Sequence, residues 1–285
     1  MVADFADLVK ARLTALVLAT TLTGFYLGWN GGDLPFWLAA GHALLGTALV
    51  AAGSAALNQL IERELDARMR RTLDRPLPAG RLRPDSALII GFALSIGGLL
   101  YLALLVNLLT ALLAAMSLVI YLFVYTPLKR VTTLNTLVGA IPGALPPLLG
   151  WTAARGSLDA GGWALFGILF FWQMPHFLAS AWMYRDDYAR GGFIMLPNVD
   201  PDGSRTGRQA LNYTFALLLV SLMPALLGVT TPGYFFGALL LGFGMLIPAV
   251  RLLLDRSRPR ARQLFLASVI YLPLLLALLA ATKAV

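Results

Sequence analysis

Three oxygen-bearing side chains recur at helical spacing near the end of the second long apolar segment. Asn58, Glu62 and Asp66 follow one another at intervals of four residues, so on a helix they form a stripe about 12 Å long on one face. Carboxylate and amide oxygens suit a hard cation such as Mg²⁺, which usually combines one or two carboxylates with substrate phosphate oxygens. The spacing therefore indicates a metal–phosphate site.

The same stretch is rich in arginine, which leaves a second interpretation open. Five arginines lie between residues 63 and 75, and guanidinium groups match phosphate oxygens well. Surface ion pairs are also common and weak, so these charges could form an ordinary solvated helix end. The position of Asn58 and Glu62 at the edge of an apolar run favours a functional site, because polar groups there are costly. A second acidic cluster comprises Asp186, Asp187, Asp200 and Asp202.

The elements that must position these residues are membrane-spanning helices. Of the 285 residues, 59% are hydrophobic and 13% charged, whereas soluble domains carry about 25% charged residues. A helix needs about 20 apolar residues to cross the hydrocarbon core. The spans expected on this basis are 11–29, 36–61, 86–106, 108–125, 134–152, 161–183, 209–229, 232–251 and 263–282. We expect an all-α polytopic membrane protein with a single domain over 1–285.

The basic residues predict the orientation of these spans. With the N-terminus in the cytosol, the cytosolic segments and their flanking residues hold all of the 22 Lys and Arg residues except Arg155 and Lys283, as the positive-inside rule requires. This distribution explains the net charge of +8 without nucleic acid as a partner. The loops 62–85 and 184–208 then share the cytosolic side and form a polar cap. We expect the first span to be retained and not to act as a cleaved signal peptide.

Three further stretches contain polar residues or helix breakers. Tyr125 and Lys129 are four residues apart, although Pro127 argues against a regular helical turn between them. His176 follows Pro175 in the sixth span; a lone histidine is more often a packing residue, but an intramembrane position favours function. The segment 139–151 contains three prolines and three glycines, which predicts a broken or kinked helix beside a cavity. No cysteine is present, so thiolate metal sites are excluded.

These stretches together resemble the UbiA-type intramembrane prenyltransferases, in the branch of that superfamily that uses heme as the acceptor. The resemblance is carried by NQLIERELDARMRRTLDRPLPAG (58–80), YTPLKRVTTLN (125–135), GALPPLLGW (143–151), W-x-x-PHF (172–177) and DDYARGGFIMLP (186–197). It implies nine helices around a central cavity and two acidic motifs that bind a prenyl diphosphate through Mg²⁺. This chain departs from the usual pattern by having Glu62 and Glu64 in place of aspartates.

The resemblance also implies roles for individual residues. The expected metal ligands are Asn58, Glu62, Asp66, Asp186 and Asp187. The expected catalytic residues are Asn58, Glu62, Asp66, Lys129 and Asp187. The expected substrate-binding residues are Arg63, Arg75, Tyr125, Arg130, Asn135, His176, Arg185 and Asp186.

The implied reaction transfers farnesyl from farnesyl diphosphate to a vinyl group of heme B, with water addition, for heme–copper oxidase assembly. The expected cofactor is Mg²⁺, and heme B is a substrate. The expected surroundings are the lipid bilayer of a bacterial-type cytoplasmic membrane, with a heme A synthase or an oxidase assembly factor as a further partner. Two alternatives remain: prenyl transfer to a hydroxybenzoate or quinone precursor, and a transporter. The transporter interpretation is disfavoured because the acids cluster at helix ends.

Overall fold

The protein is a bundle of α-helices whose computed structural model describes residues 2–284. Within these residues, nine helical stretches are long and apolar enough to cross a membrane. The helices are α1 (Val2–Leu8), α2 (Ala11–Gly28), α3 (Phe36–Asp66), α4 (Pro84–Leu105), α5 (Leu108–Val119), α6 (Thr126–Leu128), α7 (Asn135–Arg155), α8 (Ala160–Met183), α9 (Arg185–Arg190), α10 (Ser204–Ser221), α11 (Met223–Leu226), α12 (Pro232–Leu254) and α13 (Arg258–Ala281). A π-helix (Ile120–Tyr125) joins α5 to α6, and a 3₁₀ turn (Leu196–Asn198) follows α9.

The nine expected spans are confirmed, and several ends differ by a few residues. Helix α3 continues to Asp66, α10 begins at Ser204 and α13 begins at Arg258. In each case the helix extends into a charged turn, since backbone hydrogen bonds continue where the apolar run has stopped. The tight connection between α4 and α5 is fixed by Asn107, whose side chain accepts a hydrogen bond from Thr110 N at 2.8 Å.

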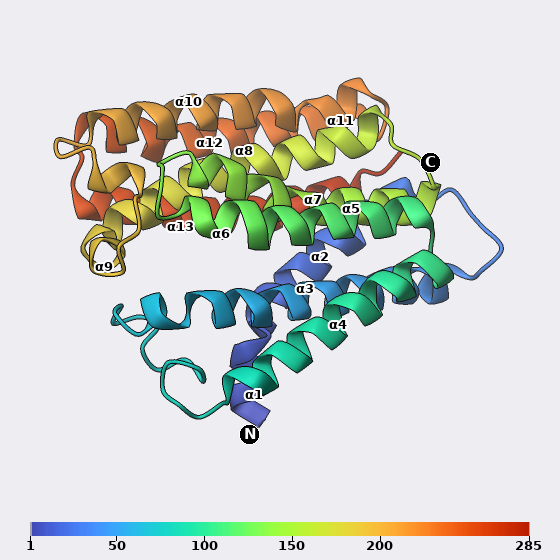
Figure 1. The fold of residues 1–285 in the computed structure, drawn as a ribbon. Helices are drawn as coiled ribbons and strands as arrows, with labels where there is room; N and C mark the ends of the chain where they lie inside the picture. Colours follow the sequence, from blue (N-terminus) through green and yellow to red (C-terminus); the bar gives the residue numbers. More distant parts are fainter. Residues whose placement is uncertain (1, 285) are drawn as a thin grey trace.

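The helices pack in two groups with α7 between them. Figure 1 shows α3 and α4 side by side at the bottom, and α8, α10 and α12 together at the top. Helix α7 contacts both α2 and α8, and most of its residues from Ala140 to Thr152 are buried. The loop after α3 and the short α9 lie at one end of the bundle, and the C-terminus lies at the other.

Helix α7 is continuous despite its prolines. It runs from Asn135 to Arg155 with Pro142, Pro146 and Pro147 inside it, so this segment is not broken, and the alternative of a kinked helix stays a prediction. Close contact with α2 accompanies the prolines: a Cβ added to Gly24 would meet Pro147 O at 1.9 Å, and one added to Gly150 would meet Thr21 O at 1.9 Å. Small residues allow such approach between membrane helices, where van der Waals packing drives association.

Candidate functional site

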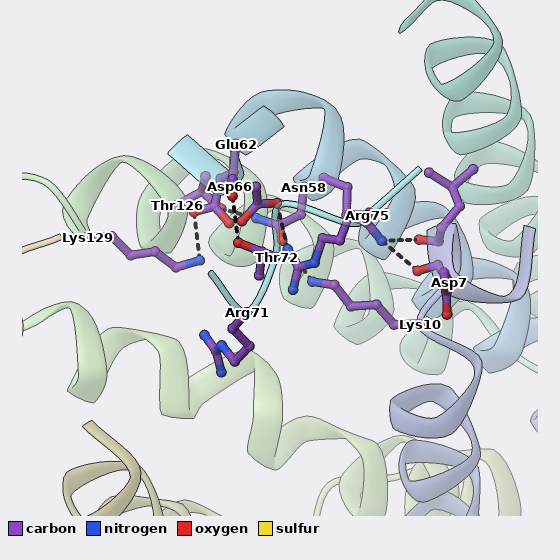
Figure 2. A network of polar contacts seen from close by, with 12 residues as sticks. Asp7, Lys10, Asn58, Glu62, Asp66, Arg71, Thr72, Arg75, Thr126 and Lys129 are labelled. Carbon is purple, nitrogen blue, oxygen red and sulfur yellow. Dashed lines mark hydrogen bonds and ion pairs between the residues drawn. The ribbon is translucent and has the colours of Figure 1, made fainter. Parts of the chain in front are cut away.

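The stripe predicted on α3 is present and buried. Asn58, Glu62 and Asp66 are 1%, 4% and 1% exposed and lie along one face at the end of the helix. Figure 2 shows their side chains gathered in one place, with Lys129 on one side and Lys10 and Arg75 on the other. Buried carboxylates are stable only when they are paired, so the groups that contact them define the site.

Each member of the stripe contacts a different cation. Lys129 Nζ lies 2.7 Å from Glu62 Oε1, and Arg75 Nη1 lies 2.6 Å from Asp66 Oδ2. Lys10 Nζ donates to Asn58 Oδ1 at 3.0 Å. The three cations come from separate segments: the α1–α2 connection, the loop after α3, and the residue that follows α6. The site therefore pairs three oxygen-bearing side chains, two of them carboxylates, with three cations within hydrogen-bond distance.

Lys10 is a site residue that the sequence did not reveal. Its backbone has φ 48°, a left-handed conformation that is uncommon for a residue other than glycine. Gln59, next to the stripe, donates from Nε2 to Asp7 O at 2.7 Å and Leu8 O at 2.9 Å, which ties down the end of α1. Burial lowers the pKa of Lys10 to about 7, and the charges of Arg75 and Lys129 act in the same direction. An anion in the site would favour its charged form.

The π-helix between α5 and α6 completes the wall around Asn58. Tyr121 OH donates to Asn58 Oδ1 at 3.0 Å, and Asn58 Nδ2 donates to Thr126 Oγ1 at 3.1 Å. Thr126 N bonds to the carbonyl of Tyr121, five residues earlier. Lys129 N bonds to the carbonyl of Tyr125, four residues earlier, at 3.2 Å, so the turn that contains Pro127 is α-helical and the expected irregularity between Tyr125 and Lys129 is wrong. Sequence reasoning missed Tyr121 and Thr126, because their contacts with Asn58 join distant segments.

Tyr125 and Lys129 are neighbours in space as well as in sequence. Lys129 Nζ lies 4.4 Å from the centre of the Tyr125 ring, within cation–π range. A Cβ added to Gly139 on α7 would meet the Tyr125 ring at 2.5 Å, so glycine at that position leaves room for the ring. The tyrosine therefore supports the lysine that contacts Glu62.

The loop after α8 packs against the loop after α3. Arg71 Nη2 donates to Tyr188 OH at 3.3 Å, and buried Met69 packs with Phe193 and Met195. Ile194 N donates to Lys129 O at 2.7 Å. The two acidic segments thus lie next to each other at one end of the bundle, as expected.

The structure does not bring the aspartates of the second segment to the stripe. Asp187 is paired with Arg190 on the same short helix, and the Asp186 side chain is 83% exposed, with Arg185 at 4.0 Å. Among residues 2–284 there is no group of three or more His, Cys, Asp or Glu side chains placed to hold a metal ion. The ligand roles assigned to Asp186 and Asp187 therefore stay predictions.

Four predicted substrate-binding residues lie outside the stripe's contacts. Arg63 lies 3.9 Å from Glu64 and lines a cavity against α4, and Arg130 is exposed. Asn135 is buried and donates to Ile194 O at 2.7 Å, so it joins the loop that follows α9 to the start of α7. Arg185 lies over the Trp182 ring at 5.0 Å.

Comparisons with known proteins agree with this geometry. The model of the UbiA prenyltransferase family matches residues 17–279. The chain belongs to the UbiA prenyltransferase family. It is 50% identical to the protoheme IX farnesyltransferase of Solibacter usitatus, with 97% of each chain covered. It is 46% identical to the protein of that name from Koribacter versatilis, with 97% of this chain and 92% of the relative covered.

Solved structures share the fold at low sequence identity. A digeranylgeranylglyceryl phosphate synthase superposes with a TM-score of 0.83 at 15% identity, with 99% of this chain and 98% of that chain covered. A UbiA homolog from Archaeoglobus fulgidus bound to GPP and Mg²⁺ has a TM-score of 0.67 at 15% identity, with 97% and 99% covered. The chain is thus an enzyme of the UbiA prenyltransferase family with that family's helical fold.

The stripe of this UbiA prenyltransferase family member suits Mg²⁺ by the chemistry of its donors. Glu62 contacts Lys129 through Oε1, and Asp66 contacts Arg75 through Oδ2. The other oxygen of each carboxylate has no hydrogen-bond partner in the described chain and is not among the buried unpartnered atoms. Two carboxylates that each retain an accessible oxygen, beside the amide of Asn58, match the partial ligand set that Mg²⁺ takes before phosphate completes it.

His176 is held in a defined orientation on α8. Its Nδ1 lies 2.8 Å from Ser268 Oγ on α13, and its ring stacks with Trp172 and Phe265, with centroids 5.0 and 4.6 Å away. Trp172 Nε1 donates to Ser268 O at 2.8 Å. The predicted position of His176 within the sixth span is therefore correct, and two of its partners, Phe265 and Ser268, lie on the ninth.

Proposed function

We propose that this chain transfers the farnesyl group of farnesyl diphosphate to a vinyl group of heme B, with addition of water, to give heme O and pyrophosphate. The observation that carries the proposal is the convergence of Lys10, Arg75 and Lys129 on the oxygen stripe of α3. Relatives at 50% and 46% identity that carry the name protoheme IX farnesyltransferase support heme as the acceptor.

The charges of the site are suited to a metal-bound diphosphate. Asn58, Glu62 and Asp66 would hold Mg²⁺, which when bound neutralises the diphosphate and makes it a better leaving group. Lys10, Arg75 and Lys129 would then shift from protein oxygens towards phosphate oxygens. Groups already placed where negative charge develops stabilise the transition state without large rearrangement. Arg71, which reaches the second loop through Tyr188, adds a fourth positive group nearby (Figure 2).

The reaction begins when the bond between C1 of the farnesyl chain and the diphosphate oxygen breaks. The electron pair leaves with pyrophosphate, and the allylic cation remains. A vinyl carbon of heme B attacks C1; water adds to the resulting cation and loses a proton, which leaves a hydroxyl group. Water must be excluded from the first cation, and the largely apolar helices around the site serve this purpose.

We assign His176 to the heme iron on the basis of its hydrogen bonds. Ser268 Oγ donates its own proton to Phe265 O at 2.6 Å, so it accepts from His176 Nδ1. A protonated Nδ1 leaves the lone pair on Nε2, the arrangement typical of metal-bound histidines. His176→Ala should remove the absorption signature of histidine ligation when heme B is added to the purified protein. An unchanged heme spectrum in this variant would contradict the assignment.

A phenolic acceptor would share the diphosphate site, so the choice between acceptors depends on an assay. Purified protein should be incubated with Mg²⁺, farnesyl diphosphate and either heme B or 4-hydroxybenzoate, and the products identified by mass. We expect farnesylated, hydrated heme and no prenylated benzoate. Prenylated benzoate alone would overturn the proposal.

Variants of the same assay test the metal ligands. Asp66→Ala and Asp187→Ala should each abolish turnover and leave the folded fraction unchanged in detergent. The two positions differ in the structure, since Asp66 contacts the stripe's cations and Asp187 pairs within α9. Full activity of Asp187→Ala with loss in Asp66→Ala would place the metal on α3 alone.

The membrane setting completes the proposal. We infer one domain over the whole chain, with the N-terminus and the site on the cytosolic side of a cytoplasmic membrane. The support is the placement of 20 of the 22 basic residues at that end of the bundle. The product's use in oxidase assembly would bring a heme A synthase or an assembly factor to this enzyme as a partner.

A further inference from the structure

A cavity lies at the end of the bundle opposite the stripe. It has a volume of about 270 Å³ and lies among the C-terminal end of α2, the α7–α8 connection, the α11–α12 connection and the C-terminal segment. The polar residues that line it are Asn30, Arg155, Asp159 and Lys283. In Figure 1 this is the end marked by the C-terminus.

The cavity gathers the two basic residues that lie apart from the other 20. Arg155 and Lys283 both line it, although they are far apart in sequence. Arg155 Nε donates to Gly28 O at 3.1 Å, and Lys283 Nζ donates to Trp29 O at 2.6 Å. Both therefore cap the end of α2, where cations are favourable. Burial lowers the pKa of Lys283, and the charge of Arg155 lowers it further, so the two cations repel each other.

The wall of the cavity contains a donor without an acceptor. Trp151 is 2% exposed, and its Nε1 has no hydrogen-bond partner among the described residues. The Arg155 guanidinium lies over the same ring, 4.8 Å from its centre. Asp159 partly balances the charge at 4.0 Å from Arg155, but it also caps α8 by accepting from Gly161 N at 3.1 Å. A buried unpaired donor is costly, and this one lies in a residue of the cavity wall.

We propose that this cavity binds the phosphodiester of an anionic phospholipid from the leaflet opposite the stripe. The cations of Arg155 and Lys283 would contact the phosphate oxygens, while Leu27, Leu227 and Val229 supply apolar walls. The adjoining α11 leaves Leu226 67% exposed, beside which the acyl chains can lie. A free phosphate ion has the same headgroup chemistry and no use for these apolar walls.

Native mass spectrometry of the full chain in detergent tests the proposal. The delipidated protein is titrated with phosphatidylglycerol, phosphatidylcholine or inorganic phosphate. We expect the wild type to retain phosphatidylglycerol over phosphatidylcholine. Arg155→Gln and Lys283→Gln should each weaken phosphatidylglycerol binding roughly fivefold, the scale of one basic residue at a membrane surface. Both substitutions keep an N–H donor for the α2 carbonyls, which protects the fold.

Arg256→Gln is the matched control. Arg256 is 39% exposed and lies 3.6 Å from Asp202 at the other end of the bundle, so the same charge change should leave phosphatidylglycerol binding unaltered. Equal losses in all three variants would show a general charge effect and overturn the proposal. Equal retention of both lipids by the wild type would also overturn it. Binding of inorganic phosphate with no preference for phosphatidylglycerol would assign the cavity to a free anion and contradict the lipid assignment.

Discussion

The ion pair between Glu62 and Lys129 contributes to the stability of the fold and also belongs to the proposed diphosphate site. Their side chains are 6% and 11% exposed and 2.7 Å apart, so each charge is stabilised by the other in a largely dry environment. Removal of one partner from a buried pair is strongly destabilising, because the second charge stays behind. The pair also belongs to the proposed diphosphate site, in which Lys129 must turn towards phosphate during the reaction. The contribution of this pair to stability and its contribution to activity can therefore be measured independently.

A double-mutant cycle at Glu62 and Lys129 makes that separation. Glu62→Leu and Lys129→Met should each lower the free energy of unfolding by about 3–5 kcal/mol. The double variant should lose clearly less than the sum, because no unpaired charge remains in it. Farnesyl transfer should be abolished in all three. The thermal midpoint in detergent and product formation provide the two measurements; additive stability losses, or turnover in the double variant, would contradict this expectation.

At the scale of elements, the amide of Gln59 fastens the end of α1 beside the site. Gln59 donates to two carbonyls at the end of α1, and Lys10 follows two residues after Leu8 in a left-handed conformation. Gln59→Met keeps the size of the side chain and removes both hydrogen bonds, each worth about 1 kcal/mol. We expect the KM for farnesyl diphosphate to rise about tenfold, with a smaller change in kcat.

Arg81→Gln is the control for the Gln59 prediction. It breaks the second attachment of α1, the contact between Arg81 Nε and Asp4 Oδ1 at 2.7 Å. Exposed ion pairs contribute little, so its KM should stay near that of the wild type. Similar KM values for Gln59→Met and the wild type would show that Lys10 is positioned without the amide.

The close contact of α2 with α7 predicts that added side-chain volume between these helices lowers stability. Gly24→Ala and Gly150→Ala would each place a Cβ 1.9 Å from a backbone carbonyl oxygen of the facing helix, so the helices must move apart. Overpacking of this kind costs about 1–3 kcal/mol or more. Gly41→Ala is the matched control, since its added Cβ meets nothing within 4 Å. Thermal midpoints in detergent should fall for the first two variants alone; an equal fall in all three would point to a general effect of the substitution.

What the sequence could predict depends on how local each signal is. The stripe on α3 follows from a spacing of four within one helix, and the spans follow from runs of apolar residues. Lys10, Tyr121 and Thr126 join the stripe across other elements, which no local pattern encodes. Of the two alternatives expected for α7, the break is absent and the kink stays a prediction, because proline content alone does not reveal how closely α2 packs against this segment.

For the whole molecule, the distribution of charge predicts which end of the bundle faces the cytosol, and this orientation can be measured. The stripe, the second loop and 20 of the 22 basic residues lie at one end of the bundle, and the cavity of Arg155 and Lys283 lies at the other. The chain has no cysteine, so a single introduced thiol reports its own position. Ser157 and Asp74 are exposed in connections at opposite ends, which makes them suitable sites for such thiols.

Labelling of intact cells with a membrane-impermeant maleimide decides the orientation. Ser157→Cys should react in intact cells, and Asp74→Cys should react only after the membrane is permeabilised. The physical reason is that Lys and Arg near helix ends are retained on the cytosolic side during insertion. The cysteine-free wild type controls for background, and labelling of both variants in detergent shows that each thiol is reachable. The reverse pattern would place the diphosphate site outside the cytosol, away from a soluble supply of farnesyl diphosphate, and would require the proposed substrate route to be abandoned.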